Sequence, residues 1–214
     1  MPSVTALSPV KRRSGWIEIQ LDGASCILLP DQDIARLGLT IGCTIEETDL
    51  ASLQSTAELA EAMRVGLRYL SVRPRSCREI ELRLLREKLA QETIERTVDR
   101  LTTLGYLDDR NFAAAFARDR IRLRPCGVRR MKADLLSRGV SPRDADDGIE
   151  SAMTEQDVNE HELLQRVASA RASKLDDLDK GVARRRLFGY LSRRGFSSEN
   201  IQKWIDTRWS AELY

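Results

Sequence analysis

The sequence predicts a mainly α protein, an elongated solenoid of three tandem three-helix repeats preceded by a small N-terminal β subdomain. Apolar residues recur three times at steps of four, five, five and four, a spacing typical of two amphipathic helices joined by a short turn. The three sets are Ile80, Leu84, Leu89, Ile94 and Val98; Met131, Leu135, Val140, Ala145 and Ile149; and Leu187, Leu191, Phe196, Ile201 and Ile205. Ahead of them, period-two alternation from Trp16 to Leu21 followed by Asp22-Gly23 predicts a β-hairpin.

The N-terminal fifty residues divide into two predicted parts. Residues 1–14 contain two prolines and a basic run, and are predicted to be a flexible tail. Residues 15–50 are predicted to form the β subdomain, with the hairpin, a short helix over 31–37 and a third short strand over 42–45. This subdomain either caps the apolar end of the helical stack, which we favour, or binds a partner independently.

Capping and stop signals divide the rest of the chain into repeats. The predicted repeats span residues 55–109, 110–153 and 158–210. In the first repeat, Ser76 and Glu79 have the spacing of a capping box that opens the second helix. In the second repeat, Gly127 takes the place of Ser76, and Gly139 ends the second helix. In the third repeat, Gly195 takes the position of Gly139. Stacked repeats of this kind offer a long surface rather than a deep pocket, which favours binding over catalysis.

Composition favours a binding protein with a strongly charged surface. The chain has 214 residues, of which 42% are hydrophobic and 32% charged, so it can bury a core while much of its surface is charged. The formal net charge is only +2, but the sign alternates in blocks. Residues 110–143 carry ten basic and two acidic side chains, whereas residues 144–162 carry eight acidic side chains and no Lys or Arg. Such a chain presents separate positive and negative faces.

The sequence offers no pattern for catalysis, a cofactor or a metal. One histidine and four well-separated cysteines without a CxxC pair argue against zinc and favour reduced thiols. The sequence has no GxSxG and no phosphate-binding glycine loop, so no catalytic residues are expected. No apolar run approaches the ~18 residues of a membrane span, and residues 1–13 differ from a signal peptide. We therefore expect a cytoplasmic protein without membrane contact.

A distinctive pattern lies at the join of repeats one and two, where Leu107, Asp108 and Asp109 are followed by Phe112 and Ala113. The residues that accompany it are Tyr69, Leu70, Ser71, Arg73, Ser76, Glu79, Leu82, Leu104, Gly105, Tyr106, Arg120, Gly127, Leu135, Arg138, Gly139 and Val140. Together these residues resemble the RecX family of RecA regulators. The resemblance covers residues 55–209, and the β subdomain lies outside it.

The resemblance implies a non-enzymatic modulator that lies along the helical groove of a RecA filament on single-stranded DNA. Such a protein restrains filament growth, ATP hydrolysis, strand exchange and the coprotease activity behind the SOS response. We expect a monomer whose partners are RecA and the RecA–DNA filament. Repeated charged surfaces agree with this in kind, because several weak contacts along a polymer reinforce one another. Capping of filament ends and occupation of the groove both remain open.

Basic side chains at helix ends in repeats two and three are the predicted contacts with the filament. They are Arg118, Arg120, Arg122, Arg124, Arg129, Arg130, Lys132, Arg184, Arg185, Arg186, Arg193 and Arg194. For the arginines at 118–124, solvation of the helix end is an equally good explanation. The basic residues at 129–132 and 184–186 open their helices, where positive charge opposes the helix dipole, so a binding role is better supported there.

Asp108, Asp109 and Phe112 are predicted to be structural. Two adjacent acids without further ligands make a poor metal site, so capping of the helix that starts near Asn111 is the preferred interpretation. Phe112 and Phe116 lie one turn apart and are expected in the core between repeats rather than in a base-stacking platform.

The alternative function is that of a helix-turn-helix DNA-binding protein, because two helices joined by a glycine-containing turn resemble that motif. A recognition helix needs polar groups near its N-terminus that contact bases, but the corresponding helices here open with acids such as Glu92, Asp144 and Glu199. Acids at that position repel phosphate. Weak, non-specific binding to the DNA backbone remains open.

Overall fold

The computed structural model describes residues 1–23 and 25–210, and Ala24, inside the predicted β subdomain, lies outside the described residues. The contacts divide the chain into two compact units. Unit 1 comprises Met1–Pro74 and Ile80–Leu107, and unit 2 comprises Arg75–Glu79 and the chain from Asp108 onward. The mainly α class with a small N-terminal sheet and three three-helix domains is confirmed.

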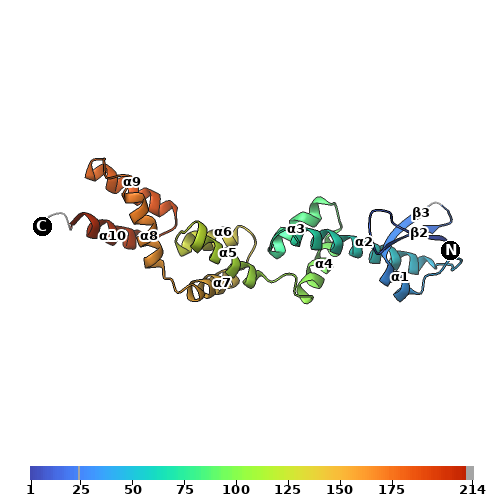
Figure 1. Ribbon diagram of the computed structural model, residues 1–214. Coiled ribbons are helices and arrows are strands. Elements are labelled where there is room, and N and C mark those ends of the chain that lie inside the picture. Colours follow the sequence, from blue (N-terminus) through green and yellow to red (C-terminus); the bar gives the residue numbers. More distant parts are fainter. Residues whose placement is uncertain (24, 211–214) are drawn as a thin grey trace. The chain divides into compact units, whose positions relative to one another are not determined.

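Unit 1 begins with an antiparallel sheet in the order β1-β2-β3, followed by a short helix (Figure 1). The elements are β1 (Val4–Pro9), β2 (Trp16–Leu21), β3 (Ser25–Pro30) and α1 (Asp31–Leu37). Strands β2 and β3 pair in a register that places Ile19 opposite Ile27. Val4, Ile19 and Leu29 are at most 1% exposed and form the core of the sheet together with Leu53 of the next helix.

Two sequence predictions for this region are wrong. Residues 4–9, expected within a flexible tail, form β1, which pairs with β2 and stands at the end of the strand order, so it is an edge strand. An edge strand tolerates proline, so Pro9 can end β1 without costing a hydrogen bond of the ladder. Residues 42–45, expected as a third strand, form instead an isolated bridge between Ser3 and Thr44, with neighbouring backbone hydrogen bonds to Pro2 and Val4.

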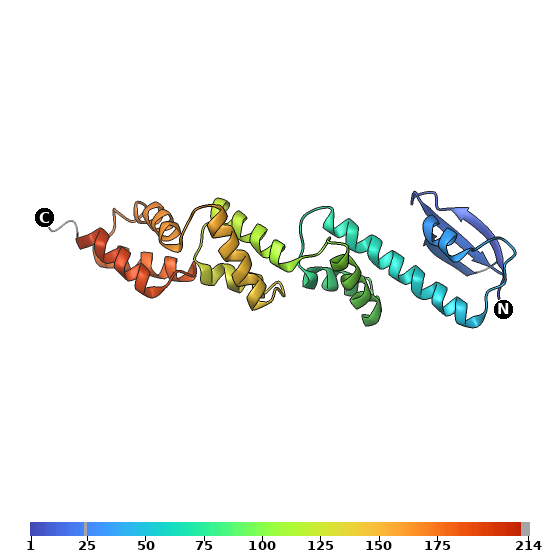
Figure 2. The ribbon, with the colours of Figure 1, turned by 90° about the horizontal axis from the view of Figure 1, so that it is seen from below.

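The long helix α2 (Glu47–Leu70) joins the sheet to the first three-helix domain (Figure 2). It begins earlier than the predicted start at residue 55, and acids in its first turn suit the positive end of the helix dipole. It packs on β3 and on α4 (Gln91–Thr103). Helix α3 (Cys77–Arg86) completes the domain, and the division between the units falls inside it, after Glu79.

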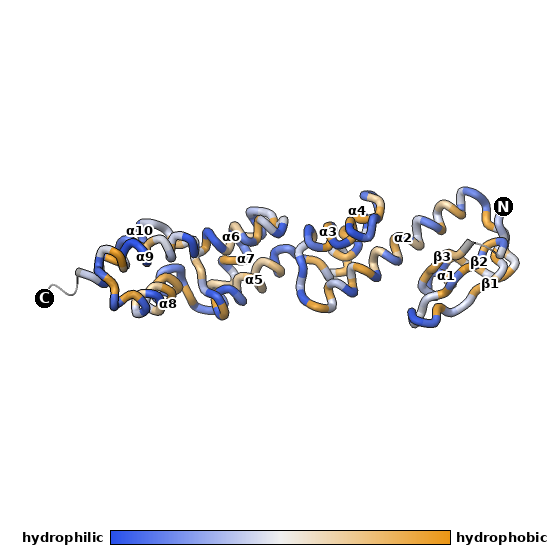
Figure 3. The backbone as a smooth tube through the Cα atoms, turned by 90° about the horizontal axis from the view of Figure 1, so that it is seen from above, coloured by the Kyte–Doolittle hydropathy of each residue, from blue (hydrophilic) through white to orange (hydrophobic). Residues whose placement is uncertain are grey.

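Unit 2 contains two three-helix domains around one continuous core. The helices are α5 (Asp109–Leu123), α6 (Val128–Leu136), α7 (Pro142–Glu155), α8 (Glu160–Ala172), α9 (Lys180–Arg193) and α10 (Ser198–Ser210). The repeated apolar residues of repeats two and three are all at most 3% exposed. In repeat one, Leu89 and Val98 are only partly buried. Hydrophobic and hydrophilic residues alternate along these helices, as amphipathic packing requires (Figure 3). No helix among the described residues is long and apolar enough to cross a membrane.

Candidate partner-binding cleft

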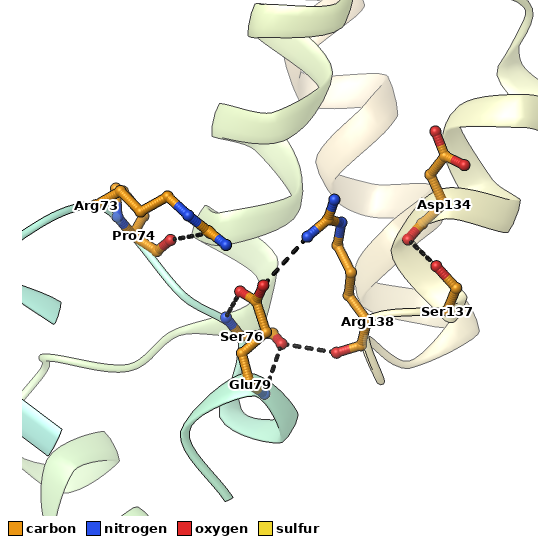
Figure 4. A network of polar contacts seen from close by, with 7 residues as sticks. All are labelled: Arg73, Pro74, Ser76, Glu79, Asp134, Ser137 and Arg138. Atoms are coloured by element: carbon orange, nitrogen blue, oxygen red, sulfur yellow. Dashed lines mark hydrogen bonds and ion pairs between the residues drawn. The ribbon is translucent and has the colours of Figure 1, made fainter. Parts of the chain in front are cut away.

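The second helices of the repeats are joined inside unit 2 by a contact that occurs twice. At its first occurrence, the Ser76 hydroxyl donates to the carbonyl oxygen of Arg138 at 2.7 Å (Figure 4). The Arg138 guanidinium donates to a Glu79 carboxylate oxygen at 3.2 Å, and the other oxygen accepts from the Ser76 backbone N–H. The charge of Arg138 is therefore compensated by Glu79, whose side chain is only 16% exposed.

At the second occurrence the same plan is used with different side chains. The backbone N–H of Gly127 donates to the carbonyl oxygen of Arg194 at 2.9 Å. The Arg194 guanidinium donates to the carbonyl oxygen of Pro125 at 2.8 Å and lies 5.2 Å from the centre of the Tyr190 ring. Arg130 follows Gly127 by three residues, as Glu79 follows Ser76. The second junction therefore carries a basic residue where the first carries the compensating acid.

This exchange produces a basic cleft of about 380 Å³ between repeats two and three. Its lining residues are Arg120, Arg124, Cys126, Arg130, Asp134, Tyr190, Arg193 and Arg194. Asp134 is the acid of the lining, and it pairs with both Arg120 at 2.8 Å and Arg130 at 3.0 Å. Burial raises the pKa of the Cys126 thiol, which favours its neutral form.

Arg124 and Arg193 are the uncompensated charges of the cleft. Both are exposed, and neither side chain forms an ion pair or hydrogen bond with another described residue. They come from the C-terminal ends of α5 and α9, so they approach the cleft from both repeats. Because five arginines and one carboxylate line the cleft, its net charge is positive, which is the charge that suits a carboxylate or phosphate group.

The remaining predicted contact residues fall into two groups. Arg118, Lys132 and Arg184 form ion pairs within the chain. Their partners are Glu155 at 2.8 Å, Asp146 at 2.7 Å and Asp206, respectively. The others are exposed and form no ion pair with any residue that the structure describes; they are Arg122, Arg129, Arg185 and Arg186. Asp134 and Tyr190 of the cleft are not among the residues predicted from the sequence. The spacing of four residues between Arg130 and Asp134, and between Tyr190 and Arg194, is the signal that could have found them.

The acids of the Asp108-Asp109 pair serve two helix starts. Asp108 is the N-cap of α5 and accepts the Asn111 N–H at 2.9 Å. Asp109 accepts the backbone N–H of Cys77, at the start of α3, at 2.8 Å. Burial raises the pKa of Asp109, because a half-buried carboxylate loses solvation. Phe112 is 7% exposed within the core of unit 2.

The third helix of each repeat opens with an acid in its first turn: Glu92 in α4, Asp144 in α7 and Glu199 in α10. Carboxylates there repel the phosphates that a recognition helix must approach. The geometry therefore gives no support to sequence-specific groove contact by these helices.

Comparison with known proteins gives matches to three family models. They are described as the RecX first, second and third three-helix domains, and they match residues 62–101, 108–149 and 159–205. Among curated proteins, regulatory protein RecX of Prosthecochloris aestuarii is 33% identical over 154 residues, which are 71% of this chain and 96% of that protein. Regulatory protein RecX of Chlorobium phaeobacteroides is 32% identical over 146 residues, which are 68% of this chain and 92% of that protein.

Two solved structures share the fold. One, titled as a crystal structure of regulatory protein RecX, superposes with a TM-score of 0.76 at 22% identity and covers 94% of this chain and 98% of its own. A second, of RecX from Lactobacillus salivarius, has a TM-score of 0.62 at 19% identity and covers 72% of this chain and 97% of its own. The first of these superpositions includes part of the β subdomain, because the helices from α2 onward make up less than 94% of the chain.

Proposed function

Because the chain belongs to the RecX family of regulatory proteins, we propose that it is a non-enzymatic modulator of RecA recombinase. It binds the RecA filament on single-stranded DNA and restrains filament growth, ATP hydrolysis, strand exchange and SOS coprotease activity. It acts as a monomer in the cytoplasm and uses no cofactor. Weak contact with the DNA backbone accompanies filament binding.

The observation that carries the proposal is the basic cleft between repeats two and three. Its charge is uncompensated on two sides, at Arg124 and Arg193, while Asp134 is occupied by two other arginines. A partly enclosed cleft focuses the field of such charges more than a flat surface does. Guanidinium groups bind carboxylates and phosphates in a bidentate manner, so the cleft suits an acidic surface of the filament or an exposed phosphate.

The test reverses the two uncompensated charges, in Arg124→Glu combined with Arg193→Glu. Neither side chain has a partner in the described structure, so the fold should be retained. We expect the concentration that half-inhibits the DNA-dependent ATPase of RecA to rise at least about tenfold, which corresponds to ~1.4 kcal/mol of binding free energy. Reversal of Arg130 and Lys132 would be less informative, because both hold acids within the fold.

The matched control is Arg143→Glu combined with Lys174→Glu. It makes the same change of charge at two exposed positions of unit 2 that are neither in the cleft lining nor among the predicted contacts. We expect it to inhibit RecA nearly as well as the wild type, and we expect added salt to weaken wild-type inhibition. Equal inhibition by both double variants would remove the cleft from the proposal, whereas unaltered RecA activity with the wild-type chain would refute the function itself.

A further inference from the structure

Unit 1 contains a second groove, of about 720 Å³, away from the residues discussed so far. Residues of β2, β3, α1, α2 and α4 line it, and Leu59, Met63 and Leu67 of α2 supply apolar side chains at successive turns. Leu104 and Tyr106, directly after α4, are 54% and 56% exposed. An exposed apolar surface of this kind, framed by polar residues, marks an interaction site.

The charge around this groove is basic. Two of its four arginines are compensated, since Arg36 pairs with Asp33 at 3.0 Å and Arg64 pairs with Glu61. The other two lie one turn apart on α4 and have no acidic partner among the described residues. Arg96 donates to the Ser55 hydroxyl at 2.8 Å, and Arg100 is exposed.

We propose that this groove binds an acidic amphipathic helix of a partner protein. Apolar side chains at helical spacing would pack on the row formed by Leu59, Met63 and Leu67, and carboxylates beside them would meet Arg96 and Arg100. The inference concerns a different unit from the basic cleft and does not rest on the proposed function.

Peptide fits this groove better than nucleic acid does. Single-stranded nucleic acid is held by successive aromatic residues, but the row from α2 consists of leucine and methionine, and the aromatic residues of the lining are Trp16 and Tyr106 alone. One face of Trp16 is already occupied, because the Arg13 guanidinium lies 5.6 Å from the ring centre. Arg13 itself pairs with Glu61 at 2.9 Å, so it is held there by the fold.

Trp16 provides a reporter at the groove. The chain has three tryptophans, and the other two, Trp204 and Trp209, belong to α10 in unit 2. Their replacement by Phe leaves Trp16 as the single tryptophan, whose emission can be excited selectively over that of the tyrosines. The probe is a synthetic helical peptide of about four turns, with Leu at positions i, i+3, i+4 and i+7 and Glu at its flanks. We expect its addition to shift the Trp16 emission in a saturable manner.

Two comparisons test the basis of recognition. Arg96→Glu combined with Arg100→Glu should weaken peptide binding at least about tenfold, whereas Arg68→Glu combined with Arg86→Glu, also exposed and in unit 1, should not. The exposed Tyr106→Ala should also weaken binding without affecting the fold. The inference is overturned if Trp16 does not respond, if a peptide with Lys in place of Glu binds equally well, or if oligothymidylate binds in its place.

Discussion

The close contact at the second junction predicts an unusually large effect for the smallest possible substitution, Gly127→Ala. Gly127 precedes α6 with φ −69° and ψ 158°, a conformation that any residue adopts, so alanine causes no backbone strain there. A Cβ atom at this position would, however, lie 2.4 Å from the carbonyl oxygen of Gly195. Ordinary van der Waals contacts of a Cβ begin near 3.4 Å, so the two backbone segments must separate by about 1 Å.

Two contributions lower the stability and a third partly offsets them. Forcing one extra carbon into a packed site costs roughly 1–3 kcal/mol. The same displacement weakens the 2.9 Å hydrogen bond from Gly127 N–H to the Arg194 carbonyl, which is worth about 0.5–1.5 kcal/mol. Alanine recovers about 0.4–1 kcal/mol by restricting the unfolded chain. At the middle of these ranges, the free energy of unfolding of unit 2 should fall by about 2 kcal/mol.

Urea denaturation measures this change, with the fluorescence of Trp204 and Trp209 reporting on unit 2 in a Trp16→Phe background. The matched control is Gly189→Ala in the middle of α9, where the nearest atom to a new Cβ is the flexible end of Arg193 at 3.3 Å. That change should stabilise the helix by up to ~1 kcal/mol. An unchanged urea midpoint for Gly127→Ala would show that the two backbones do not approach this closely in solution.

Two further predictions concern unit 2. Leu191→Ala, at a side chain that is 0% exposed, should lower the free energy of unfolding by about 2–5 kcal/mol, and a melting temperature equal to that of the wild type would contradict the assigned packing. Asp109→Asn should leave unit 2 as stable as the wild type or more stable at neutral pH, since the amide oxygen can still accept the Cys77 N–H and the desolvated charge is removed. Because burial raises the folded-state pKa of Asp109 above 3.8, the ionised form is penalised at higher pH, and the penalty disappears as the pH falls through that pKa towards 3.8. The advantage of the variant should therefore shrink in acid, and an advantage that grows in acid would contradict this sign.

The helices of repeats two and three could be predicted from the sequence because the apolar residues at helical spacing are the residues that the structure buries. Leu135 and Leu191 recur at helical spacing and are fully buried. Strand β1 could not be predicted, because its formation depends on pairing with β2, and Pro2 before it and Pro9 at its end are typical of coil. Local pattern therefore predicted amphipathic helices well and an edge strand poorly.

The basic residues of the cleft could be predicted, but their state of compensation could not. The pair between Arg130 and Asp134 lies within one helix, four residues apart, so it could be found in the sequence. The pair between Arg120 and Asp134 joins two helices and depends on how α5 packs on α6. Likewise, Arg124 and Arg193 face the same cleft only because the chain returns to Gly127 at the end of α9.

The assignment of Arg75–Glu79 to unit 2 has a consequence for how this chain can be divided. A fragment that begins at Asp108 contains two complete domains by sequence, yet it would lack the hydroxyl that binds the Arg138 carbonyl and the carboxylate that neutralises its guanidinium. The backbone N–H of Cys77, which donates a hydrogen bond to the Asp109 carboxylate, would be missing as well. The boundaries of the sequence repeats therefore differ from the boundaries of the compact units. A truncated or chimeric protein that contains repeats two and three should begin no later than Arg75 and include all of α3.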